Sequence, residues 1–349
     1  MKIIYVGPMW YGSTALLRFR VMQELGHEVV PVDTEPLKVF EKMQRLHYRI
    51  VRRFIGELDL SGANNSIINA VQQQAIDVVW VDKGVTISPG TLREVKSISP
   101  ETILVHYNMD NPFGKVRHGW RTFLKGAPFY DVHFVAREAN VHQYRAIGCR
   151  DVRRFYNSYD RNLHRPIRVS EEERKEFGGT VGFIGDYEKE RSEAMLFLAE
   201  NDIPVKVWGP NWDRKCKVRH KNLKVTTQFL KGEDYVKAVC SFDINLGFLR
   251  KINEDLHTTR SLEIPACGAF MLAERTKEHL DMFSEGIEAE FFSSDNELMD
   301  KVKYYMTNDE KRRRIGLGGR KRCIRSGYSY HDRLALLLKD VEPLVLRSK

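Results

Sequence analysis

The sequence predicts an α/β protein built from two parallel-sheet domains. Short β-rich apolar runs alternate with helical patterns along most of the chain. Strands that alternate with helices pair into a parallel sheet with helices on both faces. The alternation breaks once near the middle of the chain and then resumes, which indicates two such sheets. A length of 349 residues agrees with two domains.

The first alternating series opens with a strand at residues 2–6, a Gly-bounded turn and a helical pattern at residues 13–25. Further strands are predicted at residues 28–33, 77–81, 102–106 and 131–135. Residues 156–179 hold few β-branched residues but contain Pro166, a charged run and two adjacent glycines. This composition is typical of an interdomain linker with a short helix.

The second series begins at Thr180, with strands predicted at residues 180–184, 205–208, 242–246 and 269–272. Together the two series predict two similar sheets that face each other across a cleft. Ligands of such sheets bind beyond the carboxyl ends of the strands. We therefore expect the functional residues just after strand ends.

The composition of the chain indicates which classes of protein it can belong to. The apolar share of 42% and charged share of 30% are those of a globular protein. The start of the chain lacks the apolar region of a secretory signal, and no run of about 18 apolar residues indicates a membrane span. The five cysteines are scattered without a CxxC pair, so a reducing, cytoplasmic location is expected. The net charge of +9 suits an anionic ligand, an acidic acceptor or a membrane surface.

The turn after the first strand, Gly7 to Thr14, nearly matches the phosphate loop GxxxxGK[ST]. Ser13 stands where that loop has its Lys, which argues against a nucleoside triphosphatase. The dinucleotide fingerprint GxGxxG is absent, so Asp33 at the end of the second strand is weak support for NAD binding. Gly12 and Ser13 could approach a donor phosphate or sugar, because a glycine turn that opens a helix offers free N–H groups. A tight turn that binds no ligand explains Gly12 and Ser13 equally well.

The run from residue 104 to 112 is a strand that enters a polar turn. His106 and Asp110 are expected to face the ligand, where either could act as a general base or hold sugar hydroxyls. Alternatively, Asp110 and Asn111 only cap a turn before Pro112.

Residues 38–55 form a basic amphipathic pattern, with apolar side chains on one face and Lys and Arg largely elsewhere. Such a helix could meet an anionic acceptor or a membrane surface. The alternative is a solvated face over a core. No basic-aromatic RNA motif is present, so a nucleic-acid partner is not expected.

The second domain holds the more informative segments. A strand ends in Gly185-Asp186-Tyr187, and Arg191 follows at the start of a helix. Glycine at a strand end lets a ligand approach the backbone, and the forked guanidinium of Arg191 can reach a diphosphate.

A short helix is predicted after His257. Thr258 or Thr259 suits its N-cap, and a diphosphate can sit on the positive end of a helix. Glu263 lies about one turn further, where a carboxylate can accept both hydroxyls of a ribose. Gly268 ends the helix. The alternative for Glu263, a surface acid, is weakened by its apolar neighbours Leu262 and Ile264.

Residues 260–268 resemble the R-x-x-E-x-x-A-C-G signature of group 1 glycosyltransferases, in the branch related to the spore-maturation protein CgeB. The resemblance extends over nearly the whole chain. It implies the GT-B fold, with an acceptor-side Rossmann-like domain at residues 1–165, a nucleotide-sugar-binding domain at 166–329, and a last helix at 330–349 that returns to the first domain. It implies that Glu263 holds the ribose, Arg191 the diphosphate and His106 the donor sugar. The expected donor-binding residues are thus Gly12, Ser13, Gly185, Tyr187, Arg191, Thr258, Thr259, Arg260 and Glu263, and the candidate catalytic residues are His106 and Asp110.

The resemblance therefore predicts a hexosyl- or related transferase whose nucleotide sugar is a substrate, with no cofactor. The chain has no Asp-x-Asp triplet, so no metal is expected. The superfamily places a Glu eight residues before its ribose-binding Glu, and here that position is Asp255. Retention of configuration is the expected outcome, and inversion with Asp110 or His106 as base is the alternative. A non-catalytic sugar-nucleotide or nucleic-acid binding module is the competing function. The sequence identifies neither the base, the sugar nor the acceptor.

Overall fold

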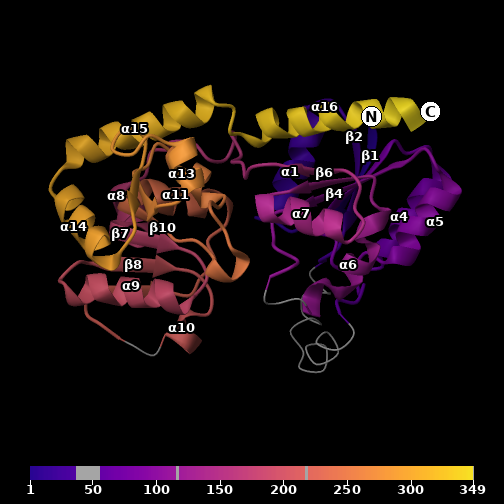
Figure 1. The fold of residues 1–349 in the computed structure, drawn as a ribbon. Coiled ribbons are helices and arrows are strands. Elements are labelled where there is room, and N and C mark those ends of the chain that lie inside the picture. Colours follow the sequence, from indigo (N-terminus) through magenta and orange to yellow (C-terminus); the bar gives the residue numbers. More distant parts are fainter. Residues whose placement is uncertain (37–55, 115–117, 217–218, 349) are drawn as a thin grey trace. The chain divides into compact units, whose positions relative to one another are not determined.

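The structure is a computed structural model that describes residues 1–36, 56–114, 118–216 and 219–348. The chain divides into two compact units (Figure 1). Unit 1 comprises Met1–Asn157, Lys251–Glu254 and Tyr330–Lys349, and unit 2 comprises Ser158–Arg250 and Asp255–Ser329. Each contains one parallel sheet of six strands, as the alternating pattern predicts.

The sheet of unit 1 has the strand order β2-β1-β3-β4-β5-β6. All neighbours are parallel. Its central strands are buried along their whole length, because helices cover both faces. The strands are β1 (Lys2–Gly7), β2 (Glu28–Asp33), β3 (Val78–Asp82), β4 (Ile103–Asn108), β5 (Val132–Val135) and β6 (Val152–Arg154).

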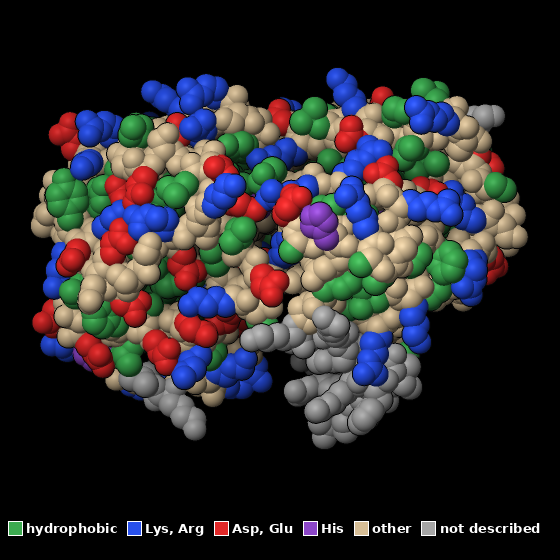
Figure 2. All heavy atoms as spheres, viewed as in Figure 1, with side chains coloured by type: hydrophobic (Ala, Val, Ile, Leu, Met, Phe, Trp, Pro, Cys, Tyr) green, Lys and Arg blue, Asp and Glu red, His purple; other side chains and the backbone are tan. Residues whose placement is uncertain are grey.

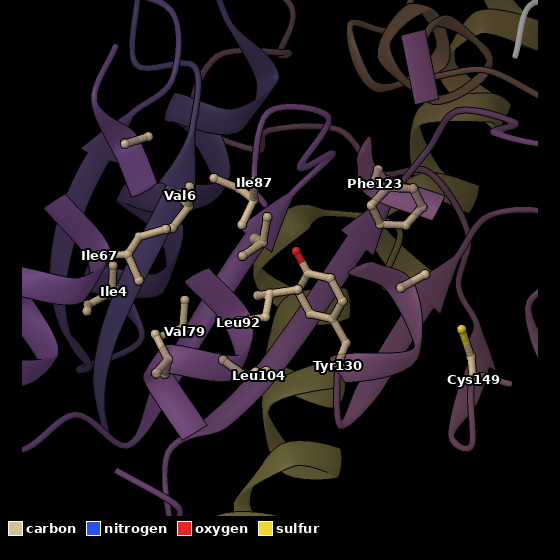
Figure 3. Close-up of a cluster of buried hydrophobic side chains, with 14 of the residues drawn as sticks. Ile4, Val6, Ile67, Val79, Ile87, Leu92, Leu104, Phe123, Tyr130 and Cys149 are labelled. Carbon is tan, nitrogen blue, oxygen red and sulfur yellow. The ribbon is translucent and has the colours of Figure 1, made fainter. Parts of the chain in front are cut away.

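Alternate side chains of these strands enter two apolar layers. One layer packs the strands against α4 (Ala63–Gln73), α5 (Pro89–Ile98), α6 (Arg121–Gly126) and α7 (Glu138–Ala146). Figure 3 shows Ile4, Val79 and Leu104 in this layer beside Leu92 and Phe123. The other layer packs the sheet against α1 (Thr14–Glu24) and α16 (Tyr330–Ser348). The last helix therefore packs on the first sheet, as the GT-B resemblance implies.

A buried ion pair links these elements of unit 1. Arg18 of α1 is 1% exposed, and its Nη2 lies 2.6 Å from Asp82 Oδ2 at the end of β3. Tyr5 also donates to that carboxylate, over 2.6 Å. The Nη1 of Arg18 lies 3.2 Å from the hydroxyl of Tyr330, the first residue of α16. One guanidinium thus joins α1, the sheet and the returning helix.

The sheet of unit 2 has the strand order β12-β11-β10-β7-β8-β9, again fully parallel. The strands are β7 (Gly179–Ile184), β8 (Val205–Trp208), β9 (Leu223–Thr226), β10 (Phe242–Gly247), β11 (Met271–Glu274) and β12 (Glu290–Phe292). One face packs against α9 (Lys189–Glu200) and α14 (Asp295–Met306), and the other against α11 (Gly232–Ser241), α12 (Arg260–Ala266) and α13 (Lys277–Met282). The remaining helices of the unit are α8 (Glu171–Phe177), α10 (Trp212–Lys215) and α15 (Asp309–Arg325).

Helix α15 packs closely on the segment after α12. A Cβ at Gly316 would lie 2.5 Å from the carbonyl oxygen of Gly268, and one at Gly319 would lie 2.4 Å from that of Glu288. Glycine is required at both positions because the backbones approach too closely for a side chain. Gly268 itself has φ +72° and follows the C-cap of α12, which confirms that it ends the helix.

Charged side chains of both signs are interspersed over the face of the molecule in Figure 2, where Lys and Arg lie among Asp and Glu. Among the described helices, none is long and apolar enough to cross a membrane.

Candidate functional site

The candidate site of unit 2 lies where its strand order reverses. The chain runs outward from β7 through β8 to β9 and then returns to form β10 on the other side of β7. In parallel sheets of this kind, ligands bind beyond the carboxyl ends of the strands at the reversal point. Here that point lies between the ends of β7 and β10, at Gly185 and Gly247.

Gly185 is where the backbone after β7 meets the loop after β8. Its N–H donates to Trp208 O over 2.8 Å, and its carbonyl accepts from Trp212 Nε1 over 2.9 Å. A Cβ on Gly209 would lie 2.0 Å from the Gly185 oxygen. Tyr187 then packs edge-on against Trp212, with ring centroids 5.3 Å apart. Gly185 and Tyr187 thus form the rim of the candidate site.

Arg191, in the first turn of α9, points back toward this turn. It is 3% exposed, and its Nη1 donates to Asp186 O over 3.1 Å. Burial lowers the pKa of Arg191, the nearby Glu188 raises it, and the neighbouring Arg260 and Arg250 lower it further. Its Nε is buried without a hydrogen-bond partner in the described part of the chain. A buried guanidinium with a spare donor beside two further cations is suited to an anion.

Arg260 and Arg250 complete this group, which we call the arginine cluster. Arg260 begins α12, and its Nη2 lies 3.5 Å from where a Cβ on Gly185 would be. Its side chain forms no hydrogen bond or ion pair with any described residue. Arg250 follows β10, is half-exposed, and lies 3.4 Å from Glu188 Oε1. Sequence reasoning missed Arg250, although a basic residue just beyond the predicted strand at 242–246 is a signal that could have found it.

Glu188 and Glu274 are two acids whose charges raise the pKa of Arg191. Glu188 Oε1 lies within ion-pair distance of both Arg191 and Arg250. Glu274 accepts the N–H of Leu249 over 2.6 Å. Arg250 and Arg260 each lower the pKa of Arg191, so the three guanidinium groups lie close enough to repel one another.

The start of α12 differs in detail from the prediction. Thr259 occupies the N-cap position but makes no side-chain cap bond. Instead the hydroxyl of Ser261 accepts from Thr258 N over 3.0 Å and lies 2.7 Å from Nε2 of the buried His279. The Nδ1 of His279 lies 2.6 Å from the carbonyl oxygen of Glu274, so Nδ1 carries the ring proton and Nε2 accepts from Ser261. Neither Thr258 nor Thr259 uses its hydroxyl as the predicted cap.

Glu263 lies one turn into α12 and is 7% exposed. Its Oε2 accepts from the hydroxyl of Tyr235 over 2.7 Å. Its Oε1 lies 3.9 Å from His164 Nε2. Arg260 and Glu263 are spaced i,i+3 on one helix, so they project from the same face. The surface-acid interpretation of Glu263 is wrong, because the carboxylate is buried and bonded.

His106, which the sequence analysis expects to face the ligand, is buried. The residue is 0% exposed in β4, and its ring stacks on Phe123 at 4.3 Å between centroids. His106 Nδ1 lies 3.0 Å from His133 Nδ1. Burial and then His133 lower the pKa of His106 well below its usual range. The ring of Tyr130, which Figure 3 shows in the apolar layer, lies 5.3 Å from the His106 ring between centroids. This buried setting does not favour His106 as a base.

The other predicted residues of unit 1 lie in loops after strands. Asp110 follows β4, is about one-third exposed, and its Oδ2 lies 3.2 Å from Lys83 Nζ. Gly12 has φ +92°. Ser13 caps α1, because its hydroxyl accepts from Leu16 N over 3.1 Å and donates to Pro8 O over 2.7 Å. The backbone N–H of Ser13 donates to Trp10 O over 3.1 Å, so the turn itself uses both the N–H and the hydroxyl of Ser13.

The structure thus brings Gly185, Arg191 and Arg260 together in unit 2, with Glu263 one helical turn away. Gly12, Ser13, His106 and Asp110 belong to unit 1. The basic stretch at residues 38–55 lies outside the described residues. Among those described, no group of His, Cys, Asp and Glu is arranged to hold a metal ion.

The fold resembles solved glycosyltransferase structures over its whole length. The Anabaena protein Alr3699/HepE, solved in complex with UDP-glucose, matches with a TM-score of 0.65 at 13% identity, over 97% of this chain and 100% of that chain. A glycosyltransferase from Rickettsia africae gives 0.64 at 11% identity, over 99% and 98% of the two chains. Sucrose-phosphate synthase from Thermosynechococcus elongatus gives 0.62 at 10% identity, over all of both chains.

The protein has the GT-B fold. Residues 191–339 also match a family model described as Glycosyl transferase-like. That match begins at Arg191 and includes the rest of the arginine cluster and Glu263. A comparison with curated protein sequences gives no significant match. The CgeB-related branch has no support in these comparisons. Within the GT-B fold, the arginine cluster occupies the strand-order reversal of the second sheet.

Proposed function

We propose that the protein is a glycosyltransferase that takes a sugar from a nucleotide-sugar donor held by unit 2. The observation that carries this is the arginine cluster: Arg191, Arg250 and Arg260 gather beyond β7 and β10, with donors that no described residue occupies. A diphosphate provides the negative charge and oxygen acceptors that these groups lack.

The comparisons support the same proposal. The segment that matches the glycosyl transferase-like family includes the cluster and Glu263. A protein with the same fold was solved with UDP and with UDP-glucose. The arrangement favours catalysis over simple binding, because several guanidinium groups at one point stabilise the charge that develops as a diphosphate leaves.

In this proposal each residue of the site has its own role in binding the donor. Arg191 is buried and fixed by Asp186 and Glu188, so it would hold the diphosphate in one position. Arg250 is half-exposed and Arg260 is unpaired among the described residues, so both can move toward the departing charge. Glu263 would accept the ribose hydroxyls.

We also propose a metal-independent reaction with retention of configuration. The arginine cluster supplies positive charge where a metal ion otherwise would. The burial of His106 and the pairing of Asp110 with Lys83 make either group less suited to act as a base, which supports this proposal. A retaining reaction, in which the leaving diphosphate takes the acceptor proton, needs neither group. Inversion with Asp110 as base is the alternative, and the anomeric configuration of the product, determined by NMR, separates the two.

The acceptor is a further proposal. The net charge of +9 favours an anionic acceptor, and the basic stretch 38–55 would contact it or a membrane surface. Five free cysteines support a reducing, cytoplasmic location.

The proposal is tested by donor hydrolysis and transfer across a panel of nucleotide sugars, together with the Arg260→Gln variant. Since no described residue pairs with Arg260, its loss should leave thermal stability unchanged while lowering nucleotide diphosphate affinity about 10-fold or more. Arg313→Gln, at a 77% exposed side chain on α15, is the matched control and should behave like the parent. Absence of nucleotide binding and of turnover with every donor contradicts the proposal.

A further inference from the structure

Helix α15 packs on unit 2 with one side and exposes the opposite side to solvent. Successive residues of an α-helix are about 100° apart around its axis. On this basis its buried residues share one arc of about 100°, and they are Arg312, Ile315, Gly316, Gly319 and Cys323. After the first turn, the exposed residues share the opposite arc of about 120°, and they are Arg313, Arg314, Leu317, Lys321, Ile324 and Arg325. We call these six residues the α15 face.

The α15 face is positively charged. Helix α15 contains eight Lys and Arg residues and two acids, a net charge of +6. Both acids, Asp309 and Glu310, lie in its first turn, so the charged side chains in the rest of the helix are all positive. Lys and Arg side chains are visible along this helix in Figure 2, at the place where Figure 1 shows α15.

Two bases of the α15 face are not neutralised by acids of the fold. Arg313 and Arg325 each lie within ion-pair distance of an acid. Arg314 and Lys321 are exposed and form no ion pair with any residue in the described ranges. Their charges are therefore available to an external anion.

Aliphatic side chains lie among these bases. Leu317 is 55% exposed and Ile324 is 58% exposed, and their spacing of two helical turns places them on the same side of α15. Ile287, whose carbonyl oxygen lies against Gly318 of α15, is 66% exposed. These three side chains leave apolar area in water that the fold of unit 2 does not bury.

The α15 face is held in place by close backbone packing. At Gly316, Gly318 and Gly319 the helix approaches carbonyl oxygens of neighbouring segments too closely for a side chain. The bases and aliphatic residues are therefore presented by a helix that is fixed on its domain. A surface of this kind loses little conformational freedom when a partner binds, which favours association.

We propose that the α15 face binds an anionic membrane surface. Basic side chains are attracted to acidic phospholipid headgroups, and aliphatic side chains between them enter the boundary of headgroups and acyl chains. A nucleic acid would satisfy the bases but leave Leu317 and Ile324 in water, so the aliphatic residues favour a lipid partner. The inference is independent of the proposed function, because the binding of a membrane by α15 requires no sugar donor.

The test measures co-sedimentation of the full chain with vesicles of phosphatidylcholine that contain about 30% phosphatidylglycerol, whose surface is anionic. The parent should bind these vesicles about 10-fold or more tightly than vesicles of phosphatidylcholine alone. Since one basic residue at such a surface contributes about 5-fold, the double variant Arg314→Glu, Lys321→Glu should bind at least about 20-fold more weakly. The double variant Leu317→Gln, Ile324→Gln should bind about 5- to 10-fold more weakly, because it removes the apolar contact.

The double variant Lys221→Glu, Lys224→Glu is the matched control. It makes the same change of charge at two exposed lysines at β9 of the same unit, and its affinity should stay within about 3-fold of the parent because solvent screens distant charges. The altered side chains of all three variants are exposed, so their melting temperatures should match that of the parent. The basic stretch at residues 38–55 is unchanged in every variant and cannot produce a difference between them.

Several results would overturn the inference. One is a parent that does not bind the anionic vesicles, and another is parent-like binding by both α15 variants, which would place the contact elsewhere in the chain. Equal losses in the lysine control would show a general effect of charge. If the parent binds a single-stranded RNA oligonucleotide and the Leu317→Gln, Ile324→Gln variant binds vesicles as the parent does, the α15 face is a surface for polyanions and not for lipid.

Discussion

Glu188 connects two arginines that come from different elements. Its Oε1 lies 3.6 Å from Arg191 Nη2 and 3.4 Å from Arg250 Nε. One carboxylate cannot neutralise two guanidinium groups, and Arg260 adds a third positive charge. An anion bound between the arginines would relieve their mutual repulsion, so their positions would depend on whether the site is occupied.

Replacing Arg191 and replacing Glu263 should have different effects on donor affinity and on the rate at saturating donor. Glu263→Gln weakens a charge-assisted hydrogen bond worth about 1.5–3 kcal/mol, so donor affinity should fall about 10- to 150-fold with little change in the rate at saturation. Arg191→Ala should also lower the rate at saturating donor, because charge builds on the diphosphate as the sugar leaves. Calorimetry and donor turnover measure both. Parent-like values for the two variants would place the donor site elsewhere.

His279 predicts an acid sensitivity in unit 2. Burial lowers its pKa from 6.5 to about 4, so between these values the unfolded chain binds a proton that the folded chain does not. The contribution of neutral His279 to the free energy of unfolding is therefore fully present above about pH 6.5. This contribution is lost as the pH falls toward 4. Protonation would also break the bond in which Nε2 accepts from Ser261.

The measurement is the melting temperature of the parent and of His279→Gln at pH 7 and pH 5. The variant should lose less on acidification, because it removes one of the groups that titrate in this range. His133, whose burial also lowers its pKa to about 4, remains in both proteins and does not affect the difference. An equal loss in the two would show that His279 does not titrate on unfolding.

At the residue scale, a short motif on one helix predicts both the position and the direction of its side chains. Arg260 and Glu263 share one face of one helix, so their spacing alone predicts that they project together. The burial of His106 was not predicted, because in a buried parallel strand both faces are covered and the alternation of side chains does not say which face meets a ligand. Tyr235 and His164 could not have been predicted, since their contact with Glu263 depends on how separate elements pack.

At the scale of the elements, most strands of both sheets were predicted close to their observed ends. Those missed are β6, β9 and β12, with three, four and three residues. All three belong to the outer parts of their sheets. Short outer strands need few apolar residues, so the apolar run that reveals a central strand is absent. The helix expected in the linker is α8, whose Ser170 and Glu173 form a capping box.

The buried pair of Arg18 and Asp82 should contribute strongly to the stability of unit 1. Arg18→Met leaves Asp82 buried without its cation, and such losses cost about 3–5 kcal/mol. Arg313→Met on α15 breaks an exposed pair at 2.7 Å and should cost less than about 1 kcal/mol. Urea unfolding followed by a probe in unit 1 measures both. Equal effects would mean that Arg18 contributes no more than a surface residue.

At the scale of the whole molecule, the proposed metal independence of the reaction has a direct test. Donor hydrolysis and transfer should persist in excess EDTA, because the arginine cluster supplies the positive charge. Rates within about 2-fold of those with added magnesium or manganese are expected, since 2-fold is only about 0.4 kcal/mol of barrier. Complete loss on chelation, restored by manganese, would overturn this expectation.

The return of α16 to the first sheet has a consequence for biosynthesis. As the ribosome extends the chain, residues 158–329 emerge as a nearly continuous stretch, so unit 2 can fold as soon as residue 329 has emerged. Unit 1 begins to emerge first, but one face of its sheet stays partly uncovered until residues 330–348, which form α16, have been made. Until then, the apolar side chains that α16 covers, and the buried charge of Arg18, are open to water and to other chains. The half of the protein that is made first would therefore be the last to mature, and for that interval the nascent first sheet is a natural client for a chaperone.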